Sequence, residues 1–173
     1  MKTFRILSFH FMFFFISITA NTIYSQIYTG GNVSFNFDNG YYADVSPIIG
    51  YQIGKFNAGV SPIIAYSKRE NMNSEYSYGG RIFSEMSIVQ GSFIHVEFES
   101  LNIESPGNQD EREWILGLPL GVGYEYEIIE NVTAHAMVLY DVLLEEDSPR
   151  DNPVVRAGIR YNLIKTRKVI SGF

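Results

Sequence analysis

The sequence predicts an all-β fold, an eight-stranded antiparallel up-and-down β-barrel. Apolar and polar residues alternate with a period of two over almost the whole chain after residue 26, which is the pattern of strands with one apolar face. No segment after residue 26 shows the period of a helix. The connections alternate between short and long, as they do when hairpins run up and down around a barrel.

Residues 1–26 are expected to be a secretory signal peptide. Lys2 and Arg5 precede an apolar run over residues 6–20, and polar residues follow it. The run is too short to cross a bilayer as a helix, and its basic start and polar exit are typical of an export signal. Cleavage is expected between Ala20 and Ile27.

Composition excludes several function classes. The chain has no cysteine, so disulfides, thiol nucleophiles and cysteine-based zinc sites are not possible. Without Lys2 and Arg5, 11 of the 13 Lys and Arg remain against 19 Asp and Glu, a formal charge of −8. This acidic balance argues against a nucleic-acid partner.

The first four expected strands each have one apolar face, and they cover residues 28–37, 45–53, 56–66 and 76–86. In the first, Val33, Phe35 and Phe37 alternate with asparagine and serine. In the second and third, the apolar sets begin at Val45 and Phe56 and recur at every second position. The fourth alternates less regularly.

The last four expected strands cover residues 94–98, 114–128, 132–144 and 155–163. Every even position from Trp114 to Ile128 is apolar, while glycine and glutamate dominate the odd positions. The two strands that follow repeat this alternation. Because one face is apolar and the other polar throughout, each strand is expected to separate two different environments.

The turns agree with the assigned faces. Paired residues of a hairpin must point to the same side, which requires two residues at Gly54-Lys55 and three at residues 89–91 and 129–131. Glycine first suits a type II′ turn, and Gly91 and Asn131 stand where a three-residue turn needs a left-handed residue. Longer connections are expected at residues 38–41, 67–74, 102–113 and 145–152.

One heptapeptide is repeated almost exactly: VSPIIGY at residues 45–51 recurs as VSPIIAY at residues 60–66. With the two-residue turn between them, Pro47 and Pro62 face each other. Neither can donate a backbone hydrogen bond, so we expect a bulge or an irregular rung there.

The alternation leaves two orientations open: the apolar face could line a soluble ligand-binding barrel or face lipid. Three observations favour lipid. Outside the C-terminal tail, only Lys55 and Lys68 follow residue 26, and both are expected in connections, whereas a water-exposed strand face normally carries lysine. Eight strands leave an interior only wide enough for side chains, and the crowding there would be relieved by Gly117, Gly121, Gly123 and Gly158. Aromatic residues gather near strand ends on the apolar face, as an interfacial girdle requires: Tyr51, Tyr66, Trp114, Tyr124, Tyr126, Tyr140 and Tyr161.

A short motif in the last strand adds a resemblance. Arg156, Gly158, Tyr161 and Leu163 match the polar-x-Gly-x-x-hydrophobic-x-hydrophobic pattern by which the assembly machinery recognises outer-membrane barrels. The chain, above all residues 139–158, resembles the small eight-stranded outer-membrane β-barrel proteins of Bacteroidota, of the OmpX and OmpA-barrel kind. The resemblance implies a barrel over residues 27–163 with a basic tail over residues 164–173. It also implies a location in the outer membrane, contact with outer-membrane lipid and handling by the barrel-assembly machinery.

If the polar faces point inward, nine charged side chains share a narrow interior and must pair. A structural ion-pair network is the main hypothesis, and a gated ion path or proton-sensitive plug is the alternative. These side chains are Arg81, Glu85, Glu97, Glu99, Glu125, Glu127, Asp141, Arg156 and Arg160.

No metal site or cofactor is expected. His95, Glu97 and Glu99 share a strand face, but neighbours at i and i+2 lie about 7 Å apart, too far to hold one ion unaided. Residues 145–151 include four acidic residues, Glu145, Glu146, Asp147 and Asp151. They lack the ligand spacing of a calcium loop, so a solvated loop is expected.

The sequence therefore predicts a monomeric barrel, closed to solutes, with a structural, adhesive or partner-binding role through its extracellular loops and an unknown extracellular partner. The second hypothesis is a soluble periplasmic, lipocalin-like barrel that binds an apolar ligand. The third is a lipid-modifying enzyme. Enzyme activity is not expected, because His95 and His135 are the only histidines after residue 26 and neither adjoins a serine motif.

Overall fold

The computed structural model describes residues 23–37, 40–69, 74–105, 108–144 and 148–168. Regular structure in these residues is β-strand only, and they contain no helix that is long and apolar enough to cross a membrane. The strands are β1 (Ile23–Asn36), β2 (Gly40–Ile53), β3 (Phe56–Arg69), β4 (Ser74–Ser87), β5 (Ser92–Ser105), β6 (Asn108–Gly117), β7 (Pro119–Ile129), β8 (Val132–Asp141) and β9 (Val154–Lys168).

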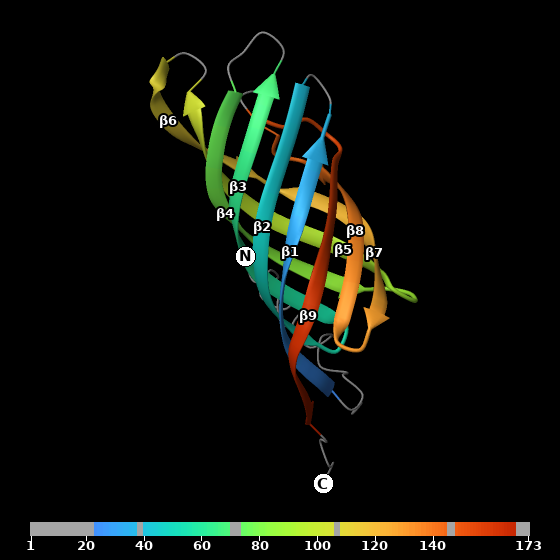
Figure 1. The fold of residues 1–173 in the computed structure, drawn as a ribbon. Helices are drawn as coiled ribbons and strands as arrows, with labels where there is room; N and C mark the ends of the chain where they lie inside the picture. Colours follow the sequence, from blue (N-terminus) through green and yellow to red (C-terminus); the bar gives the residue numbers. More distant parts are fainter. Residues whose placement is uncertain (1–22, 38–39, 70–73, 106–107, 145–147, 169–173) are drawn as a thin grey trace, which may run out of the picture.

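The strands form one closed antiparallel barrel (Figure 1). Each strand pairs with its neighbour in sequence except β6 with β7, and β1 pairs with β9 to close the ring. β6 and β7 both pair with β5, Gly117 opposite Glu99 and Leu120 opposite Val96, so they lie end to end and occupy the place of one strand. The barrel is therefore eight-stranded, and the fold predicted from the sequence is confirmed.

One end of the barrel, here called the loop end, holds the strand ends that the longer connections join, and the other, the turn end, holds the short turns (Figure 1). At the turn end, Ile53 pairs with Phe56, and Gly54 has a φ of +58°. Gly91 and Asn131 have φ angles of +82° and +67°. The left-handed residues and the lengths of the first two turns are as predicted. The third turn is shorter than predicted: Ile129 pairs with Val132, so two residues form the turn and the register shifts between Glu127 and Ile129.

The repeated proline motif interrupts the β2–β3 ladder. The pairing runs up to Val45 opposite Ile64 and resumes at Ile49 opposite Val60. Between these rungs, the Ser61 hydroxyl donates a hydrogen bond to the carbonyl oxygen of Pro47 at 2.7 Å. The predicted irregular rung is confirmed, with a serine hydroxyl as a donor where proline has none.

The prediction of a long loop over residues 102–113 is wrong. β5 continues to Ser105 and β6 begins at Asn108, so this segment is mostly a paired hairpin. The inner face of β5 changes at Leu101 from charged to apolar, and Leu101, Ile103 and Ile115 are buried in one cluster. Polar inner faces were expected throughout, so the apolar inner positions from Leu101 onward were not assigned to a strand.

Several strand bounds also differ from those predicted. β8 ends at Asp141 rather than at residue 144, and the strand predicted over residues 114–128 is divided at Leu118. Lys68, expected in a connection, lies in β3 opposite Ser74. β1 begins at Ile23, inside the predicted signal peptide, and β9 extends to Lys168, past the predicted end of the barrel at residue 163.

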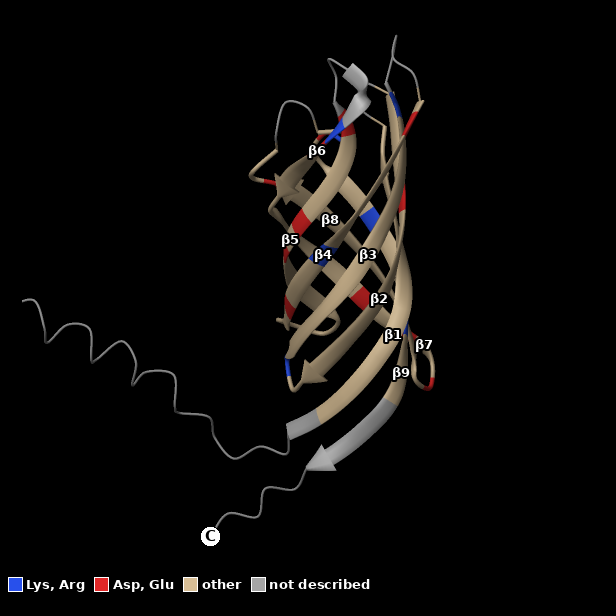
Figure 2. Ribbon diagram, turned by 90° about the vertical axis from the view of Figure 1, so that its left-hand side faces the viewer, with Lys and Arg blue, Asp and Glu red and all other residues tan. Residues whose placement is uncertain are grey.

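The two faces have the predicted orientation. The outer face is apolar, and its side chains, such as Val45 and Ile64, are 61% and 68% exposed. The inner face carries charged groups on β4, β5, β8 and β9 that are nearly inaccessible to solvent; Figure 2 shows charged positions along the barrel wall.

Candidate functional site

The candidate site is the interior of the barrel, to which the structure assigns most of the predicted charged residues. Seven of the nine are buried: Arg81, Glu85, Glu97, Glu99, Asp141, Arg156 and Arg160. Glu125 is half-buried and Glu127 is exposed, both toward the turn end. The buried residues form two groups of ion pairs.

The first group lies toward the loop end and is held together by Arg81. Its guanidinium Nη2 is 3.2 Å from both Asp44 Oδ2 and Glu99 Oε2. Asp44 was not among the predicted residues, although its even position on β2 points it inward. Glu99 makes a second ion pair, with Arg150, and Arg150 also pairs with Asp141 at 2.9 Å. Two arginines thus join three carboxylates.

Arg150 was missed by the sequence analysis because it belongs to the connection between β8 and β9. The predicted solvated loop is wrong for residues 148–150, which are buried. Burial alone would lower the pKa of Arg150, but Glu99 and the other acidic groups nearby raise it well above its usual range. The predicted inner face held six carboxylates and three arginines, and that imbalance was the available signal that a further cation enters the barrel.

The same connection is attached to the barrel wall by amide side chains. The backbone N–H of Asp141 donates to Asn152 Oδ1 at 2.7 Å, and Asn152 Nδ2 donates to the carbonyl oxygen of Asp141 at 2.9 Å. Asn36, at the end of β1, donates to the carbonyl oxygens of Asp151 and Pro153. These bonds hold the segment that carries Arg150 across the loop end. Of the predicted acidic cluster, Glu145, Glu146 and Asp147 lie outside the described residues.

The second group occupies the middle of the barrel. Arg156 Nη1 and Nη2 donate to the two carboxylate oxygens of Glu97 at 2.6 and 2.9 Å, and Arg156 Nε donates to Ser34 Oγ at 2.8 Å. His95 lies between Glu97 and Glu85, with one ring nitrogen 2.9 Å from each. Because carboxylates only accept, a ring protonated at both nitrogens satisfies both contacts.

The second group continues toward the turn end through Arg160. Its Nη2 donates to Glu85 at 2.6 Å, and its Nη1 lies 3.5 Å from Glu125. The guanidinium is also placed over the rings of Tyr28 and Phe93, 5.3 and 5.7 Å from their centres, where cation–π attraction adds to the ion pairs.

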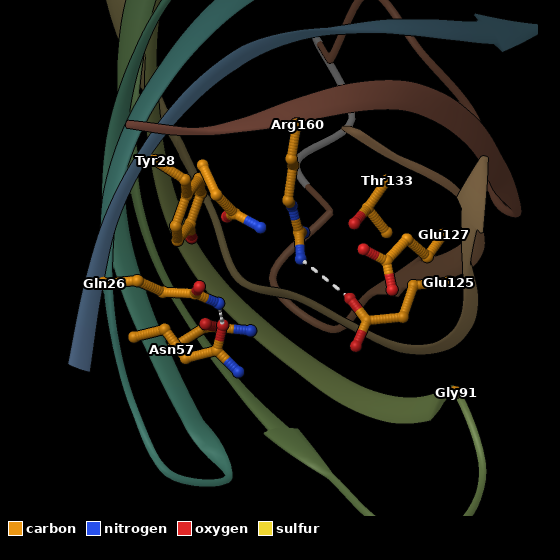
Figure 3. Close-up of a pocket in the computed structure, with 10 residues that line it drawn as sticks. Gln26, Tyr28, Asn57, Gly91, Glu125, Glu127, Thr133 and Arg160 are labelled. Carbon is orange, nitrogen blue, oxygen red and sulfur yellow. Dashed lines mark hydrogen bonds and ion pairs between the residues drawn. The ribbon is translucent and has the colours of Figure 1, made fainter. Parts of the chain in front are cut away.

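Apolar side chains cover the charged interior at the loop end. Tyr42, Ile63, Ala65, Leu101, Ile103 and Ile115 form one buried cluster. The turn end is hollow instead: a polar cavity of about 330 Å³ lies between the strands there (Figure 3). The described interior is therefore apolar at one end, ion-paired in the middle and open at the other end.

The two histidines among the described residues, His95 and His135, lie within hydrogen-bonding distance of carboxylate and amide side chains. The ring of His95 contacts two carboxylates, and His135 Nε2 lies 2.7 Å from Asn32 Oδ1. The described residues contain no group of three or more His, Asp or Glu placed to share a metal ion.

The residues of the predicted assembly signal all lie in β9. Arg156 points into the barrel, and a side chain at Gly158 would collide with Asn32 and with the backbone of β1. Tyr161 and Leu163 are about half exposed on the outer face, at 49% and 51%. The motif thus presents its two hydrophobic residues outward.

Comparison with known proteins supports the fold. No family model matches the chain, and neither does any curated protein. The N-terminal β-barrel domain of Pseudomonas aeruginosa OprF superposes with a TM-score of 0.56 at 16% identity, over 80% of this chain and 97% of that one. Neisserial surface protein A is similar with a TM-score of 0.41 at 16% identity, over 84% of this chain and 99% of that one. The OprF domain and this chain share the eight-stranded barrel fold.

Proposed function

We propose that this protein is an integral outer-membrane β-barrel, closed to solutes, that presents its loop end outside the cell. The observation that carries the proposal is the inverted distribution of side chains. Ion pairs fill the interior of a closed barrel, and apolar side chains cover its outer face. In water such a face would be a large apolar patch, whereas in a bilayer it matches its surroundings.

Two bands of exposed aromatic residues support this orientation. Tyr51, Tyr124, Tyr126 and Tyr161 lie toward the turn end, and Tyr41, Tyr76, Tyr78, Trp114 and Tyr140 lie toward the loop end. Aliphatic residues such as Val45, Ile64 and Ile82 occupy the band between them. Rings at both interfaces and aliphatic side chains between them fit lipid headgroups and acyl chains respectively.

The soluble lipocalin-like alternative fits less well. An apolar ligand needs an apolar cavity, but the middle of this barrel holds Arg156, Glu97 and His95 in mutual contact. The hollow at the turn end is lined mainly by amide, hydroxyl and charged groups. An apolar molecule would lose free energy against such a lining.

The proposed role is structural, adhesive or partner-binding, without enzymatic activity. Closure to solutes is supported by the ion pairs of Arg150 and by the apolar cluster at the loop end. The paired β5–β6 hairpin and the segment after β8 are the surfaces offered to an extracellular partner, because loops on a rigid scaffold carry specificity. Export by an N-terminal signal that is cleaved after Ala20 and before Ile23, where β1 begins, assembly through the motif in β9 and a monomeric state belong to the same proposal.

Heat modifiability tests this proposal. The full chain is expressed with its own N-terminus in a Gram-negative host, and the membrane fraction is extracted with and without detergent. A folded barrel should require detergent and should migrate faster on a gel before boiling than after it. Recovery of the folded protein from the periplasm without detergent would instead support the soluble alternative.

A further inference from the structure

The cavity at the turn end has a lining that does not resemble the rest of the interior (Figure 3). Gln26, Tyr28 and Asn57 lie on one side of it, and Glu125, Glu127 and Thr133 lie on the other. Its volume of about 330 Å³ is within the range of pockets that hold small molecules.

The charges around the cavity do not balance. Glu125 and Glu127 contribute two carboxylates, and Arg160 is the cation that lines the same space. Arg160 already donates to Glu85 at 2.6 Å, and its contact with Glu125 is longer, at 3.5 Å. The cavity therefore retains negative charge that the described residues do not neutralise.

Two deeply buried polar groups on the opposite side make no hydrogen bond to the described part of the protein. The Tyr28 hydroxyl belongs to a side chain that is 1% exposed, and Asn57 Oδ1 to one that is 3% exposed. Buried polar atoms are rarely left unpaired, because the lost hydrogen bond with water is not replaced. Asn57 lines the cavity and its Oδ1 can only accept, so a donor group bound there would satisfy it.

We propose that this cavity is a binding site for a primary ammonium group carried on a flexible chain. An ammonium has three donors and no acceptor, which matches three acceptors of the lining: the carboxylate of Glu125 on one side, and Asn57 Oδ1 and the Tyr28 hydroxyl oxygen on the other. The methylene chain of such a ligand passes Thr133 toward the open turn end. The ligand is either a free diamine or the amine of a lysine-like residue in a peptide, and both offer the same group.

The site can be tested on the full-length mature barrel refolded in nonionic detergent, so the test does not depend on where the protein resides in the cell. Amide chemical shifts of Gly91 and Thr133 are followed during titration with 1,5-diaminopentane and, separately, with Nα-acetyl-lysine amide. A saturable shift with either amine is expected, and binding of the second would point to a peptide source. No saturable shift with either probe would overturn the proposal.

Two substitutions that each remove one negative charge distinguish binding at this site from general attraction of an amine to an acidic protein. Glu125→Gln should weaken binding about ten-fold or more, because a charge-assisted hydrogen bond is lost. Glu130→Gln removes the same charge from the adjacent turn, outside the cavity lining, and should change affinity less than about two-fold at physiological salt. Equal weakening by both variants would show attraction to bulk charge and would contradict the proposal.

Two further measurements keep the result interpretable if Glu125→Gln does not fold. Tyr28→Phe removes only the unpaired hydroxyl and should also weaken binding. Bis-acetylated 1,5-diaminopentane keeps the chain but loses the charge, and it should not bind. Binding of the acetylated compound as tight as that of the diamine would show that the ammonium is not recognised.

Discussion

Arg156 and Glu97 meet across the lumen of the barrel in a two-point ion pair, with N–O distances of 2.6 and 2.9 Å. Arg156 lies in β9 and Glu97 in β5, and these strands are not neighbours in the sheet. Both residues are 1% exposed. The pair therefore connects two parts of the wall that no backbone hydrogen bond joins directly.

Loss of Arg156 should destabilise the barrel strongly. Arg156→Met leaves Glu97 buried without its main cation, at a cost of about 3–5 kcal/mol. The measurement is the urea midpoint of the unfolding transition in detergent, read from the heat-sensitive gel band. Arg112→Met is the control: Arg112 pairs with Glu104, 3.7 Å apart with both side chains about one-third exposed, and it also donates to Asn102 and to the carbonyl oxygen of Tyr76. Because water reaches the groups left behind, this variant should lose clearly less stability than Arg156→Met. A similar loss for both variants would contradict a structural role for the central pair.

Arg150→Ala should loosen the loop end. It leaves Glu99 and Asp141 without this cation, and their repulsion should release the segment after β8. Faster cleavage of residues 142–153 by a glutamate-specific protease is expected, together with discrete conductance events in planar bilayers. Arg112→Ala, which removes a more exposed arginine at the same end, should change neither the cleavage rate nor the conductance. Unaltered protection in Arg150→Ala would show that the amide contacts of Asn36 and Asn152 hold the segment alone.

Deletion of residues 145–152 removes Arg150 and Asn152 as well as the acidic residues. The sequence alone suggests a dispensable loop, but the ion pairs predict a barrel less stable than the parent. A shorter deletion of residues 145–147 keeps both anchors and should have little effect on the urea midpoint. Equal stability of the two deletions would argue against an anchoring role.

Gly158→Ala should prevent normal closure between β9 and β1. An added Cβ would lie 2.2 Å from Asn32 Oδ1 and 2.5 Å from the carbonyl oxygen of Gly31. The backbone cannot retreat without breaking the pairing of Asn32 with Gly158, so a loss of several kcal/mol is expected. Gly31→Ala is the neighbouring control, since its Cβ would meet nothing closer than 3.9 Å. Refolding yield in detergent compares the two without the assembly machinery.

The outward residues of the β9 motif should matter for assembly more than for stability. Tyr161→Ser with Leu163→Ser should lower the amount of barrel inserted in cells but allow refolding in detergent. Val138→Ser with Val155→Ser, an exposed pair on β8 and β9, removes similar apolar surface outside the motif. An equal loss in cells for both double variants would count against recognition of the motif.

The features that could be predicted from the sequence are those determined by residues close together in the chain. The alternation from Trp114 to Ile128 and the glycine at position 54 specify strand faces and turn geometry within a few residues. Arg150 could not be found in this way, because its partner Glu99 lies 51 residues earlier in the chain. The apolar inner face at Leu101 and Ile103 was also missed, since its burial depends on Tyr42, Ile63 and Ile115 from other strands.

The pairing of β1 with β9 has a consequence for how the molecule forms. The first and last strands are joined over thirteen rungs, from Ile23 opposite Lys168 to Phe35 opposite Val155. A nascent or truncated chain that stops before residue 154 would present two unpaired edges, each able to join another chain. Closure therefore requires contacts between the two ends of the sequence, and such non-local contacts make folding slow. β1 thus stays without its second partner until β9 has been synthesised, and the barrel can close only then.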